Sequence, residues 1–415
     1  MDATRRDVLR LAAALGAGAV GTGCLESSGL HRWWPIARDI FFTGTPLPAD
    51  APRSEWAGAR IAAYRRLGRT GAHVSDISFG SAKVASADVV REALDRGVSY
   101  FDTSPDYADA ASERAIGEAI RGRRDGLFLA TKFCTPRGHL AADAPVADIV
   151  AAVEGSLARL GTDHVDLVHI HACNETERLL APAVHEAFER LREQGKARFL
   201  GVSSHTPRLV EVMTAAIESG RFDVIMPAYS FKLWPELDRV LALARERDVG
   251  VVAMKTLKGA YHATLPELAG DAPSFAQSAF RWVLSNPNVS CLVISISETG
   301  QLDEYLAASG QLPTSDDVAR LERYDAATRG LYCRPGCGAC LPACPEGVAV
   351  DEVLRAEMYA ERYGDPVSGR ALYASLGEPA SRCLGCAAPC ADACPFGLEL
   401  GARTRAAHAL LSAAS

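Results

Sequence analysis

The sequence carries no excess of positive charge and little lysine. Its 44 Lys and Arg residues are outnumbered by 51 Asp and Glu residues, so the net charge is 44 − 51 = −7 with histidine neutral. A chain with this balance has no electrostatic support for general binding to nucleic acid. Six of the 44 basic residues are lysines. A lysine at a functional position is therefore informative, because its pKa shifts readily on burial whereas arginine stays charged.

A long apolar run is also missing. The apolar stretch near the start spans Leu11 to Gly23, whereas a membrane-spanning helix needs about 20 apolar residues. Together with the basic segment before it, this run resembles an export signal. The pair Arg5 and Arg6 resembles a twin-arginine signal, which is read by a translocon that carries folded proteins. Cys24 resembles the cysteine of a lipoprotein cleavage site, so a lipid anchor there is one expectation.

We therefore predict a twin-arginine signal over residues 1–24 and a linker over residues 25–60, where Trp and Pro recur without a sustained period. The expected location is the periplasm, with the protein either free or anchored as a lipoprotein. The alternatives are an ordinary amphipathic helix at the N-terminus, or an unused signal on a cytoplasmic protein.

Cysteine is sparse in most of the chain and dense at its end. The sequence has 12 cysteines, and eight of them fall after residue 330. A density of this kind predicts a cross-linking framework in the tail. The overall composition, with 48% apolar and 23% charged residues, is typical of a folded globular protein. At about 150 residues per domain, a chain of 415 residues predicts two to three domains.

Short apolar runs alternate with segments of helical period through the middle of the chain. We predict strands at 76–80, 98–102, 127–131, 165–170, 198–203, 223–228, 249–254 and 290–296. We predict helices at 86–96, 112–122, 146–160, 181–194, 207–219, 235–247, 273–285 and 299–309. This order predicts an α/β protein with a (β/α)₈ TIM barrel over residues 61–330, preceded by a small hairpin near Tyr64. A doubly wound open sheet is the alternative, but no Gly-x-Gly-x-x-Gly follows the first strand.

The C-terminal strand ends, where barrel enzymes place their active sites, carry a chemically coherent set. Asp102 ends the second strand and Tyr107 follows it, Lys132 ends the third, and His171 follows the fourth. An ammonium near a phenol stabilises the phenolate and makes the phenol a better acid, and a carboxylate holds the ammonium in place. His171 could then orient a carbonyl oxygen. His169, two residues earlier on the same strand face, is interpreted as structural.

These residues also carry a resemblance to the aldo-keto reductase family. The segments that resemble it are Asp102-x4-Tyr107, Thr131-Lys132, Asp166 to His171, Ser156 to Asp163, Gly195 to Ser203 and Arg281 to Leu284. The resemblance implies an NAD(P)H-dependent carbonyl reductase with Tyr107 as the general acid, Lys132 and Asp102 as its tuners and His171 as the carbonyl orienter.

The same resemblance places the nicotinamide cofactor across the barrel mouth. It implies that Ser203 and Ser204 lie near the carboxamide, and that Tyr229 or the strand end at Lys255 lies near the ring and phosphates. After the eighth strand the chain has no basic residue before Arg320, where family members often hold the adenosine phosphate. A preference for NADPH is therefore not expected.

The tail holds two versions of one cysteine motif, each ending in Cys-Pro. The two runs are Cys333-x3-Cys337-x2-Cys340-x3-Cys344 and Cys383-x2-Cys386-x3-Cys390-x3-Cys394. Both resemble the bacterial ferredoxin run, in which the fourth cysteine ligates the other cluster. We therefore predict two [4Fe–4S] clusters in a ferredoxin-like domain over residues 331–415, the first bound by Cys333, Cys337, Cys340 and Cys394, and the second by Cys383, Cys386, Cys390 and Cys344. Disulfides and two zinc sites are the alternatives.

The sequence thus predicts an exported oxidoreductase that interconverts a small carbonyl compound and an alcohol with NAD(P)(H). The clusters are expected to relay electrons to a redox partner protein. Export by the twin-arginine translocon fits this content, because clusters are inserted during folding in the cytoplasm. A protein of another class, which transfers electrons or binds a ligand without catalysis, is the alternative.

Overall fold

The computed structural model describes residues 54–141, 143–205, 208–231, 235–257, 274–334, 337–361, 366–377 and 379–412. The predicted signal, Cys24 and most of the predicted linker lie outside these residues. The chain divides into two compact units. In the described residues, the barrel unit comprises 54–347 with 389–398, and the helical unit comprises 348–388 with 399–412. The part of the chain that the structure describes contains no helix long and apolar enough to cross a membrane.

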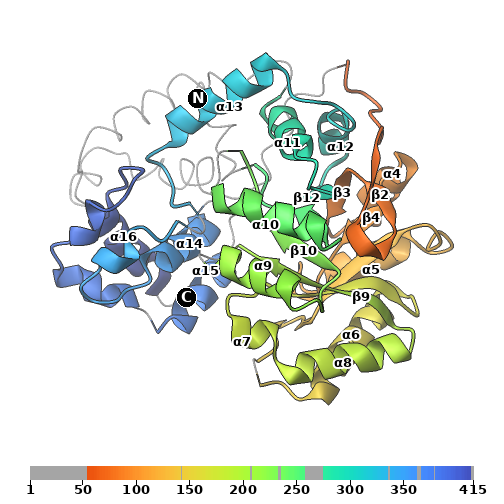
Figure 1. Cartoon of the computed structure of the whole chain (residues 1–415), viewed down its shortest axis with the longest axis horizontal. Helices are drawn as coiled ribbons and strands as arrows, with labels where there is room; N and C mark the ends of the chain where they lie inside the picture. The colour runs from red at the N-terminus through yellow and green to blue at the C-terminus, as the bar shows by residue number, and fades with distance from the viewer. Residues whose placement is uncertain are drawn as a thin grey trace, which may run out of the picture. The chain divides into compact units, whose positions relative to one another are not determined.

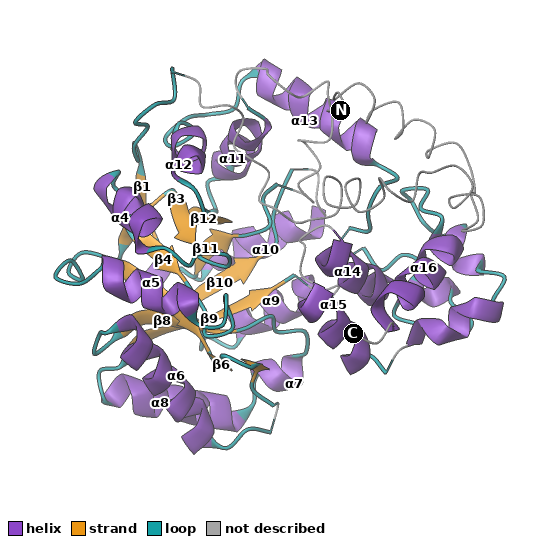
Figure 2. Cartoon of the chain, turned by 180° about the vertical axis from the view of Figure 1, so that it is seen from behind, coloured by secondary structure: helices purple, strands orange, loops and turns teal. Residues whose placement is uncertain are grey.

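Eight parallel strands close into a barrel, which confirms the predicted α/β barrel (Figure 2). Each strand pairs in parallel with its neighbours in the order β10-β11-β12-β3-β4-β5-β8-β9. All eight predicted strands are present, with ends that differ from the prediction by a few residues. Their bounds are β3 Ile77–Gly80, β4 Tyr100–Asp102, β5 Phe128–Lys132, β8 Val165–Ile170, β9 Ala197–Ser204, β10 Val224–Pro227, β11 Gly250–Ala253 and β12 Cys291–Ser295.

Helices surround the barrel, and all eight predicted helices are found (Figure 1). They are α4 Ala87–Asp95, α5 Ala111–Ala119, α6 Val146–Leu160, α8 Pro182–Glu193, α9 Leu209–Glu218, α10 Pro235–Glu246, α11 Phe275–Ser285 and α12 Thr299–Leu306. The elements that were not predicted include the short helix α7 Thr176–Leu179, the helix α13 Ser315–Thr328 and the hairpin of β6 Cys134–Thr135 and β7 Gly138–His139. Strands of two residues are too short to show a period in the sequence.

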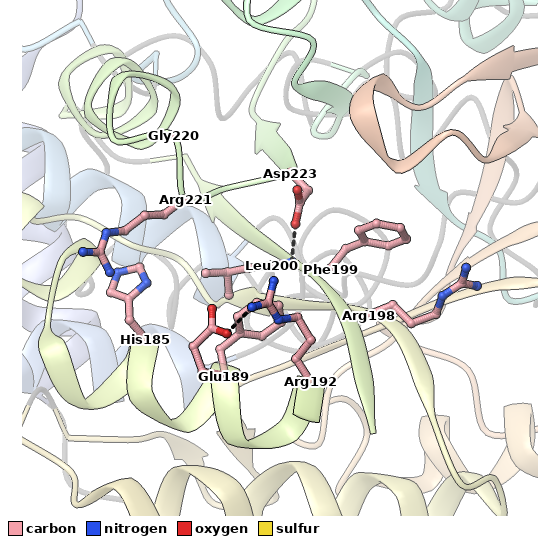
Figure 3. A pocket seen from close by; sticks show the side chains of 10 residues that line it. His185, Glu189, Arg192, Arg198, Phe199, Leu200, Gly220, Arg221 and Asp223 are labelled. Atoms are coloured by element: carbon pink, nitrogen blue, oxygen red, sulfur yellow. Dashed lines mark hydrogen bonds and ion pairs between the residues drawn. The ribbon is translucent and has the colours of Figure 1, made fainter. Parts of the chain in front are cut away.

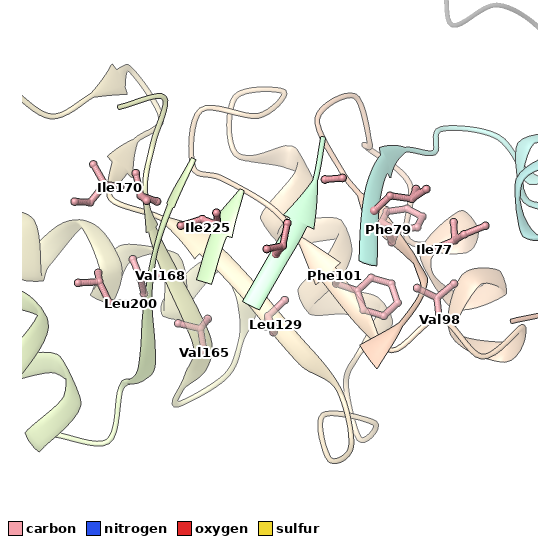
Figure 4. Packing of buried hydrophobic residues seen from close by; sticks show 14 of the residues in the cluster. Ile77, Phe79, Val98, Phe101, Leu129, Val165, Val168, Ile170, Leu200 and Ile225 are labelled. Atoms are coloured by element: carbon pink, nitrogen blue, oxygen red, sulfur yellow. The ribbon is translucent and has the colours of Figure 1, made fainter. Parts of the chain in front are cut away.

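Successive side chains of each strand point to opposite faces of the barrel wall, so the strands separate two apolar cores. Phe101 and Leu129 point outward into the large core between barrel and helices, which Figure 4 shows in part. Tyr100 and Phe128, one residue earlier on the same strands, point into the lumen and stack at 5.3 Å between ring centroids. Because side chains alternate along a strand, Asp102 and Lys132 also face the lumen, two or four residues nearer the mouth.

A small hairpin closes the base of the barrel, as the glycine turns near Tyr64 predict. It consists of β1 Tyr64–Arg66 and β2 His73–Ser75, with a 3₁₀ turn η2 Gly68–Thr70 between them. Leu67 is fully buried and packs into the lumen core. The Arg66 side chain also pairs with Asp248 in the turn before β11. Since the base is closed by this plug, the lumen is reached from the other end, where the strands finish.

The lumen is filled tightly beneath the mouth. His169 is fully buried, and neither of its ring nitrogens makes a hydrogen bond. It lies beside Gly201 of β9 in the parallel register. A Cβ on Gly201 would lie 2.4 Å from His169 Nδ1, far inside contact distance. These contacts are consistent with the interpretation of His169 as a structural residue.

We therefore expect Gly201→Ala to destabilise the protein by roughly 1–3 kcal/mol, the usual cost of overpacking a core. Adding His169→Ala removes the ring that the new methyl group meets, so the two changes together should cost less than the sum of their separate costs. Thermal unfolding of the four proteins, followed by circular dichroism, measures this coupling. Strictly additive losses would show that the ring is not the obstacle.

The helical unit packs three helices around a short 3₁₀ segment. The elements are α14 Val350–Glu361, α15 Pro366–Ser375, η6 Pro379–Gly385 and α16 Leu400–Ser412. Arg403 Nε lies 2.8 Å from Glu357 Oε2, and Tyr373 Oη lies 2.6 Å from His408 Nδ1. The first cysteine run belongs to the barrel unit, whereas the second run is divided, with Cys383 and Cys386 in the helical unit and Cys390 and Cys394 in the barrel unit. The ferredoxin-like domain over residues 331–415 stays a prediction.

Candidate active site

A buried ion pair lies at the C-terminal end of two neighbouring strands. Lys132 Nζ donates hydrogen bonds to Asp102 Oδ1 at 2.5 Å and to the Thr103 carbonyl at 2.8 Å. Lys132 is 1% exposed and Asp102 is 4% exposed. Burial raises the pKa of Asp102, and the Lys132 ammonium opposes that shift. Asp102 Oδ2 is buried without a hydrogen-bond partner, so Lys132 is what compensates this carboxylate.

Tyr107 and His171 complete the predicted set around this pair. Lys132 Nζ lies 4.7 Å from the centroid of the Tyr107 ring. The His171 ring meets the Tyr107 ring edge-on at 5.9 Å between centroids. Burial and the Lys132 ammonium hold the pKa of His171 well below its ordinary value, so the imidazole is neutral near pH 7. The structure therefore brings together all four residues predicted to carry the chemistry.

The backbone beside these residues is held in uncommon conformations. Ala108, Asp109 and Ala110, directly after Tyr107, have φ values of 49°, 54° and 61°. Ala172, directly after His171, has φ 46°, and the predicted cofactor residue Lys255 has φ 57°. Left-handed conformations are costly for residues other than glycine and tend to cluster at functional sites. The strain is consistent with a site at this end of the barrel.

Hydrogen bonds fix the strand ends from behind. Ser81 Oγ and the Ser81 amide both donate to the Asp102 carbonyl. Glu113 of α5 is fully buried, accepts a bond from Thr131 Oγ1 at 2.8 Å and pairs with Arg159 of α6 at 2.5 Å. Sequence reasoning missed Glu113, because nothing near it in the chain signals that Arg159 lies beside it. These contacts hold β4 and β5, and thus the Asp102–Lys132 pair, in register.

The four predicted cofactor residues lie at or just after the ends of β9, β10 and β11. Ser203 Oγ accepts a hydrogen bond from the Ala172 amide at 3.0 Å, and Ser204 is fully buried. Tyr229 is 2% exposed, and its hydroxyl donates to Asp238 at 3.2 Å and accepts from Asn286 at 3.0 Å. These bonds give Tyr229 a packing role towards α10 and α11. That any of the four contacts a nucleotide stays a prediction.

The polar groups of the segment after β12 form hydrogen bonds with one another and with the backbone of the same segment. Glu298 caps α12, and its carboxylate accepts from the backbone of that helix. Gln301 Oε1 accepts from the amides of Ser297 and Glu298 at 2.8 and 3.2 Å. An anion at this helix start would meet a carboxylate, with no basic residue between Arg281 and Arg320 in the sequence. The arrangement does not favour a 2′-phosphate here.

A cavity lies at the end of the barrel opposite to the candidate active site (Figure 3). Its volume is about 380 Å³, and its lining comes from the start of β9, from α8 and from the turn before β10. Arg192, Arg198 and Arg221 contribute to it, and the Asp223 carboxylate accepts from the Leu200 amide at 3.0 Å. None of the predicted catalytic residues lines this cavity.

Comparisons with known proteins agree with the fold. Residues 73–268 match the aldo/keto reductase family. The chain is 25% identical to L-galactose dehydrogenase from Arabidopsis thaliana over 285 residues, which cover 60% of this chain and 88% of that protein. It is 30% identical to the uncharacterized oxidoreductase YrpG of Bacillus subtilis over 221 residues, which cover 47% of this chain and 67% of that protein.

Among solved structures, the chain is similar to an aldo-keto reductase from Klebsiella pneumoniae in complex with NADP and acetate. The TM-score is 0.52 at 23% identity, covering 63% of this chain and 94% of that one. The fold and the family match define an α/β-barrel oxidoreductase. The chain belongs to the aldo/keto reductase family, whose members reduce carbonyl groups with NAD(P)H.

The buried pair leads to a prediction that separates stability from chemistry. Lys132→Met leaves the Asp102 carboxylate buried and unpaired, which should cost about 3–5 kcal/mol of unfolding free energy. Adding Asp102→Asn removes the orphaned charge, so the double variant should regain much of that stability. It should not regain carbonyl reduction, because the ammonium beside Tyr107 is still missing. Thermal unfolding and activity assays on both variants test this, and a double variant that recovers activity would contradict the tuning role.

Proposed function

We propose that the protein is an exported reductase that interconverts a small carbonyl compound and an alcohol, with two [4Fe–4S] clusters that relay electrons. The observation that carries the proposal is the buried Lys132–Asp102 pair against the Tyr107 ring, because this arrangement turns a phenol into a usable acid. NAD(P)H, when bound, supplies the hydride. The residues of the chain supply the proton and the orientation.

Each residue of the site has a distinct proposed role. Tyr107 gives its phenolic proton to the carbonyl oxygen during reduction and takes it back during alcohol oxidation. Lys132 stabilises the resulting phenolate, and Asp102 holds the ammonium in place. His171, as a neutral imidazole, donates a hydrogen bond that orients the same oxygen. The closed lumen below excludes bulk water from this side.

The residues fit the two ends of the nucleotide unequally. At the nicotinamide end, the side chains of Tyr107, Lys132 and His171 lie together. Asp102 Oδ2 is buried there and makes no hydrogen bond. At the phosphate end, Glu298 and Gln301 already satisfy the start of α12. We therefore propose that the protein does not prefer NADPH over NADH.

The donor chemistry of the tail fits iron–sulfur clusters. The chain offers two runs of four thiols, each followed by proline. Two of these sulfurs accept backbone hydrogen bonds at 3.4 Å, Cys386 from the Ala388 amide and Cys394 from the Leu398 amide. Such bonds to the cysteine sulfur are among the factors that tune cluster potentials.

Contacts within the barrel unit support the crossed ligand pattern. The 3₁₀ turn η5 Leu341–Ala343, which precedes Cys344, contacts η7 Pro389–Ala391, which contains Cys390. The Arg334 guanidinium, next to Cys333, lies 4.2 Å from the centroid of the Phe396 ring, two residues after Cys394. The end of the second run thus lies beside the first, as sharing of the fourth cysteine requires.

The number of electrons released by the substrate or nucleotide equals the number that two clusters can accept. Oxidation of an alcohol or of a reduced nicotinamide releases two electrons, and two clusters that each accept one electron take up both. The two protons released from the alcohol, or the one proton released from the reduced nicotinamide, pass to the site or to solvent. Since free NAD(P)H is not expected outside the cytoplasm, we propose that nucleotide is bound before export and retained.

Anaerobic purification with iron, sulfide and nucleotide quantified on one sample tests the proposal. We expect about eight iron and eight sulfide per chain, together with bound nucleotide, and loss of the cluster colour when a reducing substrate is added. Zinc in place of iron would contradict the clusters. Absence of bound nucleotide, with unchanged cluster colour on adding substrate, would contradict the relay.

A second candidate is an electron-transfer protein without carbonyl chemistry. Glu298 and Gln301 already cap the start of α12, so this helix start is less able to bind a nucleotide phosphate. Weak nucleotide binding would leave the barrel without a hydride donor, which favours this second candidate. A third is a cytoplasmic NAD(P)H reductase whose signal is unused. Fractionation of the cells of origin separates the cytoplasmic candidate from the exported ones, since a protein confined to the cytoplasm would rule out export.

A further inference from the structure

Four side chains with metal-binding atoms meet beside the proposed active site. They are Asp106, Cys134, His139 and His171, and their donor atoms all lie within 4.8 Å of one another. The reductase proposal uses His171 but gives no role to the other three. The set offers two imidazole nitrogens, one sulfur and one carboxylate oxygen, and these are the three types of ligand that zinc binds in proteins.

The fold brings these donors together from three consecutive strand ends. Asp106 lies in the loop after β4, and His171 follows β8 directly. Cys134 and His139 belong to the unpredicted hairpin after β5, where they are paired opposite each other. Directly opposed residues of a hairpin point to the same side. The hairpin therefore presents a thiol and an imidazole together towards Asp106 and His171.

Two of the distances between donor atoms are close to those of a tetrahedral metal site. His171 Nδ1 lies 3.6 Å from Asp106 Oδ2, and His139 Nε2 lies 3.9 Å from the same oxygen. For metal–ligand bonds of 2.0–2.3 Å, the edge of a tetrahedron is about 3.3–3.8 Å. Because the donor atoms lie within 4.8 Å of one another, a zinc ion between them would draw the most distant atoms closer by about 1 Å.

Two further observations point towards a ligand. His171 Nδ1 is buried and makes no hydrogen bond, so it lacks the partner that a buried ring nitrogen normally has. The Ser104 hydroxyl donates to the Asp106 carboxylate. A hydrogen bond of this kind orients ligating carboxylates in metal sites.

The charge balance is also suitable for a divalent ion. A thiolate at Cys134 and the Asp106 carboxylate bring two negative charges, which neutralise an M²⁺ ion. The ammonium of Lys132 is paired with Asp102 and does not oppose the ion as a free charge. Sulfur and nitrogen donors exclude calcium and magnesium, which take oxygen ligands.

We infer that Asp106, Cys134, His139 and His171 form a binding site for a divalent transition-metal ion of the zinc class at the mouth of the barrel. The site is separate in chemistry from the cysteine runs of the tail and from hydride transfer. His171 belongs to both proposals. Metal content and carbonyl reduction are therefore measured in separate assays, so that a negative result in one assay does not refute the other proposal.

The test uses the full chain, purified anaerobically with its tail cysteines intact. Wild type, Cys134→Ser and His139→Gln are compared with Cys173→Ser, which removes a fully buried thiol just past β8 that is outside the group. Each protein is incubated with zinc chloride and desalted, and zinc and iron per chain are measured by elemental analysis. The tail cysteines are unchanged in all four proteins, so any zinc or iron that they bind is the same in each protein and does not affect the comparison.

We expect Cys134→Ser and His139→Gln to hold about one zinc ion fewer per chain than wild type and Cys173→Ser, with equal iron. Equal zinc in all four proteins would overturn the site. Should Cys134→Ser fail to fold, His139→Gln decides the question, because the His139 side chain is 41% exposed and its loss leaves the core intact.

Discussion

Tyr107→Phe is expected to reduce kcat/KM for carbonyl reduction by about 10²–10⁴, the usual contribution of a positioned general acid. This corresponds to roughly 3–5 kcal/mol of transition-state stabilisation. The phenyl ring keeps the contacts with Lys132 and His171, so the fold and the shape of the site should persist. The change removes the transferable proton alone. Steady-state assays with a panel of aldehydes and aldoses, with NADH and with NADPH, measure it.

Tyr100→Phe is the matched control for this substitution. Tyr100 lies on the same strand as Asp102, faces the lumen and has a buried hydroxyl without a hydrogen-bond partner. Removing that hydroxyl should leave both stability and activity close to wild type. Undiminished activity of Tyr107→Phe would refute the assignment of the acid. Equal losses in both variants would show that the effect is structural.

Replacement of the proposed cluster ligands is expected to remove iron in a pattern that tests the proposed crossed arrangement. Cys333→Ala, Cys390→Ala and Cys394→Ala should each lose one cluster, about four of eight iron atoms. The double variant of Cys333 and Cys394 should lose no more than either single change, because both residues are proposed to bind the same cluster. The double variant of Cys333 and Cys390 should lose both clusters. Iron analysis and electron paramagnetic resonance of the reduced proteins distinguish these outcomes.

Cys173→Ala serves as the control for these variants, since its thiol is buried in the barrel unit and donates to the Glu175 carbonyl at 3.3 Å. It should keep all the iron. Loss of both clusters in the double variant of Cys333 and Cys394 would show that each run binds its own cluster. Unchanged iron in every single variant would remove the cysteine runs from cluster binding altogether.

The barrel and the proximity of the candidate catalytic residues could be predicted because they depend on local patterns. Apolar runs and helical periods mark each strand and helix, and strand ends of a parallel barrel meet at one mouth, so Asp102, Lys132 and His171 could be brought together from the sequence. The structure then adds the direct bond from Lys132 to Asp102 and the ring contact with Tyr107.

Features that depend on contacts between distant segments could not be predicted. The hairpin of β6 and β7 has two residues in each strand, too few for a pattern, and it alone brings Cys134 and His139 to the site. The burial of Glu113 depends on Arg159 from another helix. Likewise, the hydroxyl of Tyr229 turns to Asp238 and Asn286, partners that no spacing in the sequence indicates.

Transfer of deuterium tests hydride transfer in the barrel most directly. The wild-type protein is incubated with nicotinamide nucleotide deuterated at C4 of the reduced ring and with an aldehyde or aldose that it reduces, and the product is examined by mass spectrometry. Direct transfer at the Tyr107 site predicts one deuterium on the carbinol carbon, and its formation should fall with the Tyr107→Phe variant. A product alcohol without deuterium from either face of the nucleotide would contradict hydride transfer by this barrel.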